Sequence, residues 1–144
     1  MKRYLLTTLP LFGLCALPLA ASTGADLIIE QRQAAFERIE DGLDRIKRAY
    51  RGHAPDWPLI IVESTALNEQ GDYLLAAFPE GTRDGSKARK SIWRKREDFE
   101  RRLHDFKQRL DGLRQAAVNR DPWALATARQ AVDDTCMGCH RRYR

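Results

Sequence analysis

Apolar residues recur along this chain at spacings of three, four and seven, which predicts helices and no strands. The first helix is expected from about residue 25 to 51. Its predicted apolar face consists of Ile28, Ala35, Ile39, Leu43, Ile46 and Tyr50. Gly42 lies inside this segment, where glycine weakens a helix, so we expect its missing side chain to permit close packing against a partner helix or the haem.

A second helix is predicted from about Asp56 to Phe78, with Pro58 tolerated in its first turn. Its predicted apolar positions are Leu59, Val62, Ala66, Tyr73, Leu74 and Phe78. The segment from Pro79 to Lys90 contains two glycines and is the only extended loop that the pattern predicts.

The third predicted helix has the clearest pattern, from Ile92 to Ala117, and only Arg96 interrupts its apolar seam. A short turn precedes the fourth helix, for which Asp121 is the predicted N-cap and Pro122 the first residue. This helix is expected to continue to the C-terminus. Four amphipathic helices with mostly short connections predict an all-α fold, an antiparallel four-helix bundle.

The N-terminal segment has the order of a secretory signal peptide: two basic residues, an apolar stretch over residues 5–20 and then small residues. We expect cleavage between Ala20 and Ala25. Residues 1–21 are therefore assigned to the signal peptide and 22–144 to the bundle, which would be periplasmic. A retained membrane anchor is less favoured, because the apolar stretch is short and interrupted by prolines.

Near the C-terminus, Cys136, Cys139 and His140 form a C-x-x-C-H run, the spacing of c-type haem attachment. The two thiols would bond covalently to the haem, and His140 would be the axial iron ligand. Since Cys15 leaves with the signal peptide, these are the only cysteines of the mature chain. We predict one covalently attached haem c per chain, near the C-terminal end of the bundle.

A disulfide, a thiol–disulfide redox pair and a structural zinc site are the alternatives for the two cysteines. Redox pairs gain thiolate character at helix N-termini, whereas this pair lies near the end of a helical segment. A zinc site needs four ligands, and His53 and His104 are not at finger spacing.

The chain resembles the cytochrome c′ family, the high-spin type of class II c-type cytochromes, over nearly all of its mature length. The segments that carry this resemblance are Arg32–Phe36, Gly52–Pro55, Ala76–Thr82, Ile92–Trp93 and Cys136–Arg144. The resemblance implies a haem protein that transfers electrons between Fe(III) and Fe(II), not an enzyme, and it often implies a homodimer.

The resemblance also implies a haem pocket, formed by Arg32 and Gln33 near the propionates, Phe36 on the distal side, Trp93 beside the haem and Arg144 on the proximal side. Ordinary surface or core roles remain the alternatives for these residues. Where the family often has Pro-Glu before Ile-Trp, this chain has Lys90 and Ser91, so a haem contact there would differ.

The residue that faces the other side of the iron decides the function. Met137 lies between the haem cysteines, and Met1 leaves with the signal peptide, so no methionine is available as a sixth ligand. Bis-histidine ligation through His53 or His104 is a minor alternative. With Phe36 in the distal position, five-coordinate iron open to nitric oxide and carbon monoxide is expected, and binding or scavenging of these gases is the alternative function.

The formal net charge is +5, and loss of Lys2 and Arg3 lowers it to +3. This small positive net charge is only weak evidence for a charged binding partner, and export from the cytoplasm argues against nucleic acid as a partner. The local run Arg141, Arg142 and Arg144 beside the predicted haem suggests steering of an acidic redox partner protein, although a solvated tail is an equal alternative.

Overall fold

A computed structural model describes residues 24–51 and 54–144, which form helices and no strands. The helices are α1 (Gly24–Tyr50), α2 (Trp57–Leu75), α3 (Ser91–Arg94), α4 (Arg96–Val118) and α5 (Pro122–Tyr143). The predicted signal peptide and His53 lie outside the described residues. None of the described helices is long and apolar enough to span a membrane.

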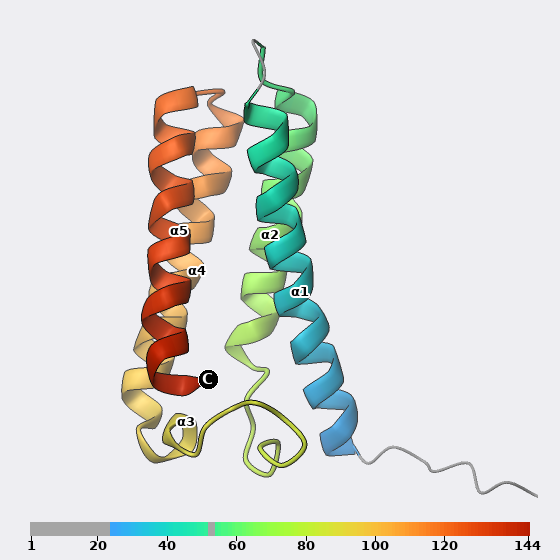
Figure 1. The fold of residues 1–144 in the computed structure, drawn as a ribbon, viewed down its shortest axis with the longest axis vertical. Coiled ribbons are helices and arrows are strands. Elements are labelled where there is room, and N and C mark those ends of the chain that lie inside the picture. Colours follow the sequence, from blue (N-terminus) through green and yellow to red (C-terminus); the bar gives the residue numbers. More distant parts are fainter. Residues whose placement is uncertain (1–23, 52–53) are drawn as a thin grey trace, which may run out of the picture.

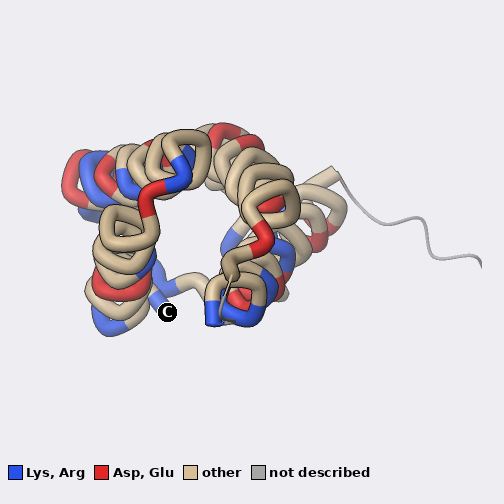
Figure 2. Tube along the Cα trace, turned by 90° about the horizontal axis from the view of Figure 1, so that it is seen from above, with Lys and Arg blue, Asp and Glu red and all other residues tan. Residues whose placement is uncertain are grey.

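The four long helices run alternately up and down and form a ring (Figures 1 and 2). α1 packs along α2, α2 along α4, and α4 along α5. α1 and α5 close the ring without comparable backbone packing. The predicted all-α antiparallel four-helix bundle is therefore confirmed, and its least packed side lies between α1 and the helix that carries Cys136 and His140.

Every long helix contributes to one continuous core. The largest fully buried apolar side chains are Ile46, Ile60, Leu67, Leu74, Leu110, Leu113, Leu125 and Val132. Removing such side chains from water stabilises the fold by about 1.5–3 kcal/mol each. The core fixes how the helices meet, and so it positions the residues at the lower end of the bundle.

The predicted apolar face of α2 is largely wrong. Leu74 and Phe78 are buried, but the side chains of Leu59, Val62 and Tyr73 are 37%, 65% and 37% exposed, and Ala66 is also exposed. The buried face consists of Ile60, Ser64, Leu67, Asn68, Gly71 and Leu74. Apolar residues lie on all sides of α2, so their spacing alone did not identify the side that faces α1 and α4.

Two helix boundaries also differ from the prediction. α2 ends at Leu75. The segment that follows is held by Arg32 of α1 and Arg96 of α4, which donate to the carbonyl oxygens of Ala77 and Phe78. The third predicted helix is divided at Lys95, whose backbone leaves the helical region with φ −124° and ψ 49°. The short helix α3 is thereby redirected, and the Trp93 indole Nε1 donates to the carbonyl oxygen of Pro79 at 3.1 Å.

The predicted helix starts are confirmed. A side-chain oxygen of Asp121 accepts hydrogen bonds from the backbone nitrogens of Trp123 and Ala124 at 3.0 and 2.9 Å. Asp56 caps α2 in the same way, accepting from the nitrogen of Leu59 at 3.1 Å. These bonds satisfy donors that have no partner within the helix, which explains why both helices begin after an aspartate and contain an early proline.

Gly42 permits the close approach of α1 and α2, as expected. A Cβ atom at this position would lie 2.6 Å from Cδ2 and 3.2 Å from Cγ of Leu67, a core side chain that is 2% exposed. Leu67 has no room to move aside within a packed core. The absence of a side chain at Gly42 therefore sets the distance between these helices.

We expect Gly42→Ala to lower the free energy of unfolding by about 1 kcal/mol, because overpacking outweighs the gain in helix propensity. Gly112→Ala is the matched control, since its Cβ would meet no atom within 4 Å on α4. It should raise the free energy of unfolding by about 0.5–1 kcal/mol. Urea unfolding followed by circular dichroism measures both, and stabilisation by Gly42→Ala would contradict the packing argument.

Candidate haem site

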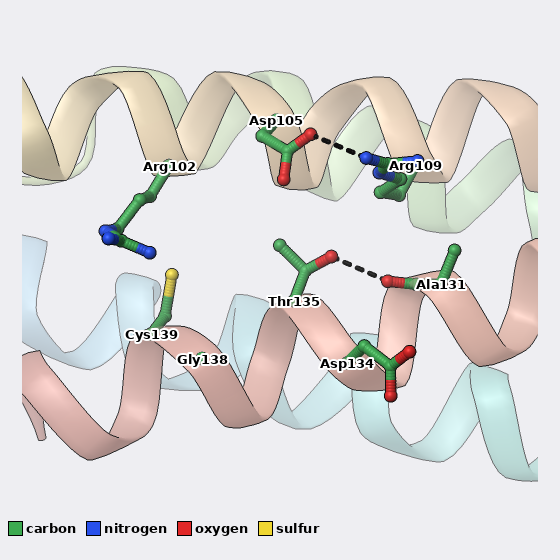
Figure 3. A pocket seen from close by; sticks show the side chains of 8 residues that line it. All are labelled: Arg102, Asp105, Arg109, Ala131, Asp134, Thr135, Gly138 and Cys139. Carbon is green, nitrogen blue, oxygen red and sulfur yellow. Dashed lines mark hydrogen bonds and ion pairs between the residues drawn. The ribbon is translucent and has the colours of Figure 1, made fainter.

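Cys136, Cys139 and His140 lie on the last turns of α5. Both thiols are half-buried and neither is bridged. Cys136 packs against the core, while Cys139 lines a cavity of about 340 Å³ between α4 and α5 and points toward Arg102 (Figure 3). The structure therefore brings the predicted attachment residues together at one end of the bundle.

The geometry and chemistry of the two thiols weaken the alternatives to haem. Residues three apart on a helix have Cβ atoms about 5–6 Å apart, whereas a disulfide requires about 3.5–4.5 Å. Burial raises the pKa of Cys136 to about 11 and also raises the pKa of Cys139. Reactive redox cysteines have lowered pKa values, so this environment does not favour a thiol–disulfide catalyst.

The His140 imidazole lies near the charge of Arg144. Burial lowers the pKa of His140, and the Arg144 guanidinium lowers it further. Both effects favour the neutral imidazole, the form that binds metals. Arg144 is also tied to the helix, since its backbone nitrogen donates to the carbonyl oxygen of His140 at 3.2 Å.

Tyr143 anchors the last turn of α5 to α4. Its side chain is buried, and its hydroxyl donates to Oδ2 of Asp98 at 2.5 Å. The same carboxylate oxygen accepts from Nε of Arg102 at 2.9 Å. The Tyr143 hydrogen bond and the one from Arg102 lower the pKa of Asp98 to about 2. This contact fixes the turn that contains His140.

A row of aromatic rings connects α1 with the end of α5. The ring centroids of Phe36 and Phe78 are 6.4 Å apart, those of Phe78 and Phe99 are 4.7 Å apart, and those of Phe99 and Tyr143 are 5.2 Å apart. Each pair meets edge to face, a favourable arrangement for aromatic quadrupoles. Phe36, at one end of the row, remains 37% exposed. We call these four residues the aromatic row.

Arg32 is a buried cation beside the aromatic row. It is 3% exposed, and its guanidinium carbon lies 4.6 Å from the ring centroid of Phe78. Its nitrogens donate to the carbonyl oxygen of Ala77 at 3.2 Å and to the hydroxyl and carbonyl oxygens of Thr82 at 3.1 and 2.9 Å. Burial lowers its pKa. No carboxylate in the described part of the chain forms an ion pair with it.

The remaining predicted pocket residues lie at the same end of the bundle. Gln33 is exposed on α1, next to Arg32. Trp93 packs against the core. Lys90 is exposed, and the Ser91 hydroxyl donates to the carbonyl oxygen of Arg142 at 3.1 Å, so these two positions adjoin the last turn of α5.

Of the two histidines that were alternatives as a sixth ligand, the structure describes only His104. His104 is exposed on α4, beside Arg101 and Gln108. His53 lies outside the described residues. Met137 is 61% exposed on α5.

Sequence reasoning missed several residues that build this end of the molecule. Phe78 was predicted only as an apolar position of the second helix, Phe99 lies within the predicted third helix without an assigned role, and Thr82 was named only as part of the family resemblance. Asp98 and Arg102 are spaced i, i+4, the signal of a helix-surface ion pair, and nothing in the sequence showed that Tyr143 joins them.

These residues fit a haem c. Two unbridged thiols and an imidazole on one helix end are the groups that would attach the haem and bind its iron, and the helix that carries them borders the least packed side of the bundle. Phe36 offers an apolar edge, and Arg32 offers a buried positive charge without a protein carboxylate, suited to a macrocycle that bears two carboxylates.

Tyr143→Phe should lower the stability of the protein at neutral pH, because Asp98 loses the donor that contributes most to its low pKa. The folded-state pKa of Asp98 is below the usual 3.8, so its stabilisation is present above about pH 4 and is lost as the pH falls toward 2. The difference from the unsubstituted protein should therefore be larger at pH 6 than at pH 2.5, in urea unfolding.

Tyr73→Phe is the control for this substitution. The Tyr73 hydroxyl makes only an exposed contact of 3.4 Å with Oε1 of Gln31. The substitution Tyr73→Phe should therefore change the free energy of unfolding little at either pH. An equal loss from Tyr143→Phe at both pH values would contradict the role given to Asp98.

Comparison with known proteins supports the fold and a haem c family. The family model described as Cytochrome C' matches residues 27–144. Cytochrome c′ of Pararhodospirillum photometricum is 28% identical over 118 residues, which cover 81% of this chain and 94% of that protein. Cytochrome c-556 of Agrobacterium tumefaciens (strain B2A) is 26% identical over 117 residues, covering 81% and 95%.

Solved structures agree as well. Recombinant native cytochrome c′ from Alcaligenes xylosoxidans superposes with a TM-score of 0.78 at 27% identity, covering 86% of this chain and 98% of that one. The family model spans most of the chain, including the C-x-x-C-H run and every helix that forms the site. This chain belongs to the cytochrome c′ family of haem c proteins.

Proposed function

We propose that this protein is a periplasmic electron carrier with one covalently attached haem c, cycling between Fe(III) and Fe(II) and exchanging electrons with a redox partner protein. The observation that carries the proposal is the free C-x-x-C-H run, with Cys136, Cys139 and His140 held on the anchored end of α5. The signal-peptide pattern of residues 1–21 supports export.

In this proposal each residue has a defined task. Cys136 and Cys139 attach the haem covalently, and His140 is its axial ligand. Haem iron, when bound, supplies one-electron chemistry and an axial position that a diatomic gas can occupy. Arg144 lies beside the imidazole and favours its neutral form.

The other proposed pocket residues shape the surroundings of the cofactor. Arg32 supplies the buried positive charge, with Gln33 beside it at the surface. Trp93, Lys90 and Ser91 adjoin the pocket from the segment before α4. None of these residues is proposed as an acid–base pair for oxidase or peroxidase chemistry. We therefore propose that the protein is an electron carrier and not an enzyme.

Binding of nitric oxide or carbon monoxide is the second candidate function, and Phe36 favours it. Its ring packs edge to face against Phe78 and is 37% exposed. A phenyl ring has no lone pair to offer the iron. A distal phenylalanine would therefore leave five-coordinate iron and admit only small ligands that displace the ring.

Absorption spectra of the purified holoprotein test both functions. We expect a high-spin ferrous spectrum whose Soret band shifts on addition of carbon monoxide. A low-spin spectrum indifferent to carbon monoxide would contradict the open site and leave electron transfer alone. Absence of any Soret band would contradict the haem itself and favour a haem-free bundle.

Phe36→Ala should raise the association rate constant for carbon monoxide by at least about tenfold, because it removes the side chain that blocks the distal position. Flash photolysis measures this rate. Leu27→Ala is the matched control: Leu27 is an exposed apolar residue of α1, nine positions away and so about half a turn around the helix. Equal rates in all three proteins would contradict the distal assignment of Phe36.

We further propose that the protein forms a homodimer through α2. Leu59, Val62, Ala66 and Tyr73 are exposed and are spaced so that they form one stripe along this helix. Such a stripe on one face of a bundle is typical of an interface that another apolar surface covers.

Val62→Glu places a charge in the centre of this stripe and should shift the protein from dimer to monomer in sedimentation velocity. Val118→Glu is the control, because Val118 is 46% exposed at the end of α4, away from the stripe. A monomeric unsubstituted protein, or a dimer unaffected by Val62→Glu, would contradict this interface.

A further inference from the structure

Exposed cations from two distant segments of the chain gather at the end of the bundle that carries His140. We call them the cationic end, which consists of Lys87, Arg89, Lys90, Arg94, Arg141 and Arg142. The first four belong to the connection before α4 and to α3, and the last two to the final turn of α5. Figure 1 shows these elements at the same end of the molecule.

Hydrogen bonds hold the two segments of the cationic end together. The backbone nitrogen of Arg89 donates to the carbonyl oxygen of Tyr143 at 3.0 Å, and its side-chain Nη1 donates to that of Arg141 at 3.3 Å. Ser91 adds the bond to Arg142. The C-terminal arginines are therefore part of a defined surface, which removes the alternative of a solvated tail.

The charges of the cationic end are not neutralised within the chain. No ion pair joins any of its six side chains to a carboxylate in residues 24–51 or 54–144. Residues 24–144 carry a formal charge of +3, because Lys2 and Arg3 hold two of the five net charges. The cationic end carries six positive charges, so the rest of that stretch is negative by three. A charge so unevenly distributed orients an approaching charged partner.

The surface has the chemistry of a transient, ionic contact. None of the large apolar side chains that are exposed in the described structure belongs to residues 83–95 or 140–144. Tyr143, which follows Arg142, is buried, and the Trp93 indole nitrogen donates to the carbonyl oxygen of Pro79. Stable interfaces and membrane-surface segments rely on apolar anchors, whereas short-lived electron-transfer contacts are small and polar.

We propose that the cationic end is the docking surface for an acidic electron-transfer protein. The proposal rests on the proposed haem function, because Arg141 and Arg142 directly follow the predicted iron ligand, and a partner docked there would lie close to the redox centre. In the transfer, one electron leaves the partner's reduced cofactor and converts ferric to ferrous iron, with no proton or bond change.

A flavodoxin, an acidic flavin protein, is a suitable probe. Titration calorimetry of the ferric holoprotein with oxidised flavodoxin measures docking without electron transfer, and stopped-flow absorption with reduced flavodoxin measures the second-order rate constant. Both are measured at ionic strengths of about 0.01 M and 1 M, where the Debye length is about 30 Å and 3 Å. Reduced lumiflavin, an uncharged flavin, gives the rate without docking.

The test variant is Lys87→Glu with Arg94→Glu, which reverses two charges of the cationic end without touching a proposed haem residue. The control is Arg48→Glu with Arg51→Glu, which changes the net charge equally through exposed residues at the opposite end of the bundle. At low ionic strength we expect the test variant to lose at least about tenfold in affinity and rate, and the control less than about twofold. At high ionic strength the difference should vanish.

Equal losses in both variants, or a rate that does not depend on salt in the unsubstituted protein, would overturn the docking surface. Binding to phosphatidylglycerol vesicles in sedimentation, without binding to flavodoxin, would overturn it in favour of a lipid surface. Lumiflavin distinguishes failure of the docking surface from failure of the proposed electron-carrier function. A protein that reduced lumiflavin cannot reduce lacks the redox centre, which contradicts the proposed function. If lumiflavin reduces every variant at the same rate, the redox centre is intact and only the docking surface is in question.

Discussion

The hydrogen bond from Tyr143 to Asp98 is the contact on which the functional end of the molecule depends. It ties the last turn of the chain to α4, and the same turn carries His140 and the backbone carbonyls that Arg89 and Ser91 hold. A helix end normally frays, because its last carbonyls lack partners within the helix. Here those partners come from the segment before α4, so the last turn of α5 has a fixed geometry.

Two arginines support this end from other helices. Arg32 of α1 holds the carbonyls of Ala77 and Thr82, and Arg96 of α4 donates to the carbonyl oxygen of Phe78 at 2.6 Å. The connection after α2 is thus positioned by charged groups that reach its backbone, and it presents Phe78 to the aromatic row. Arg96, which interrupts the apolar seam of α4, is explained by this bond.

The fold could be predicted from the sequence because helical periodicity and capping residues are local signals. Asp56 and Asp121 marked the helix starts correctly, and Gly42 marked a close helix contact. The orientation of α2 could not be predicted, since Leu59, Val62 and Ile60 are equally apolar and only their neighbours in space decide which one is buried. The division at Lys95 depends on bonds to residues far along the chain.

The candidate site likewise combines residues that the sequence predicts with contacts that it does not. Cys136, Cys139 and His140 could be predicted because the C-x-x-C-H spacing is itself the signature of haem attachment. The burial of Arg32, the Phe78 and Phe99 rings between Phe36 and Tyr143, and the joining of Arg89 to the C-terminus are tertiary features. They arise from contacts between residues about 20 to 50 positions apart, for which one sequence carries no signal.

The weak packing between α1 and α5 also has a consequence for how this end of the bundle can open. α1, α2 and α4 contact one another in series without α5, whereas α5 packs extensively on α4 alone among the long helices. The helix that carries Cys136 and Cys139 can therefore separate from α1 with little loss of packing, while α1, α2 and α4 keep their contacts with one another.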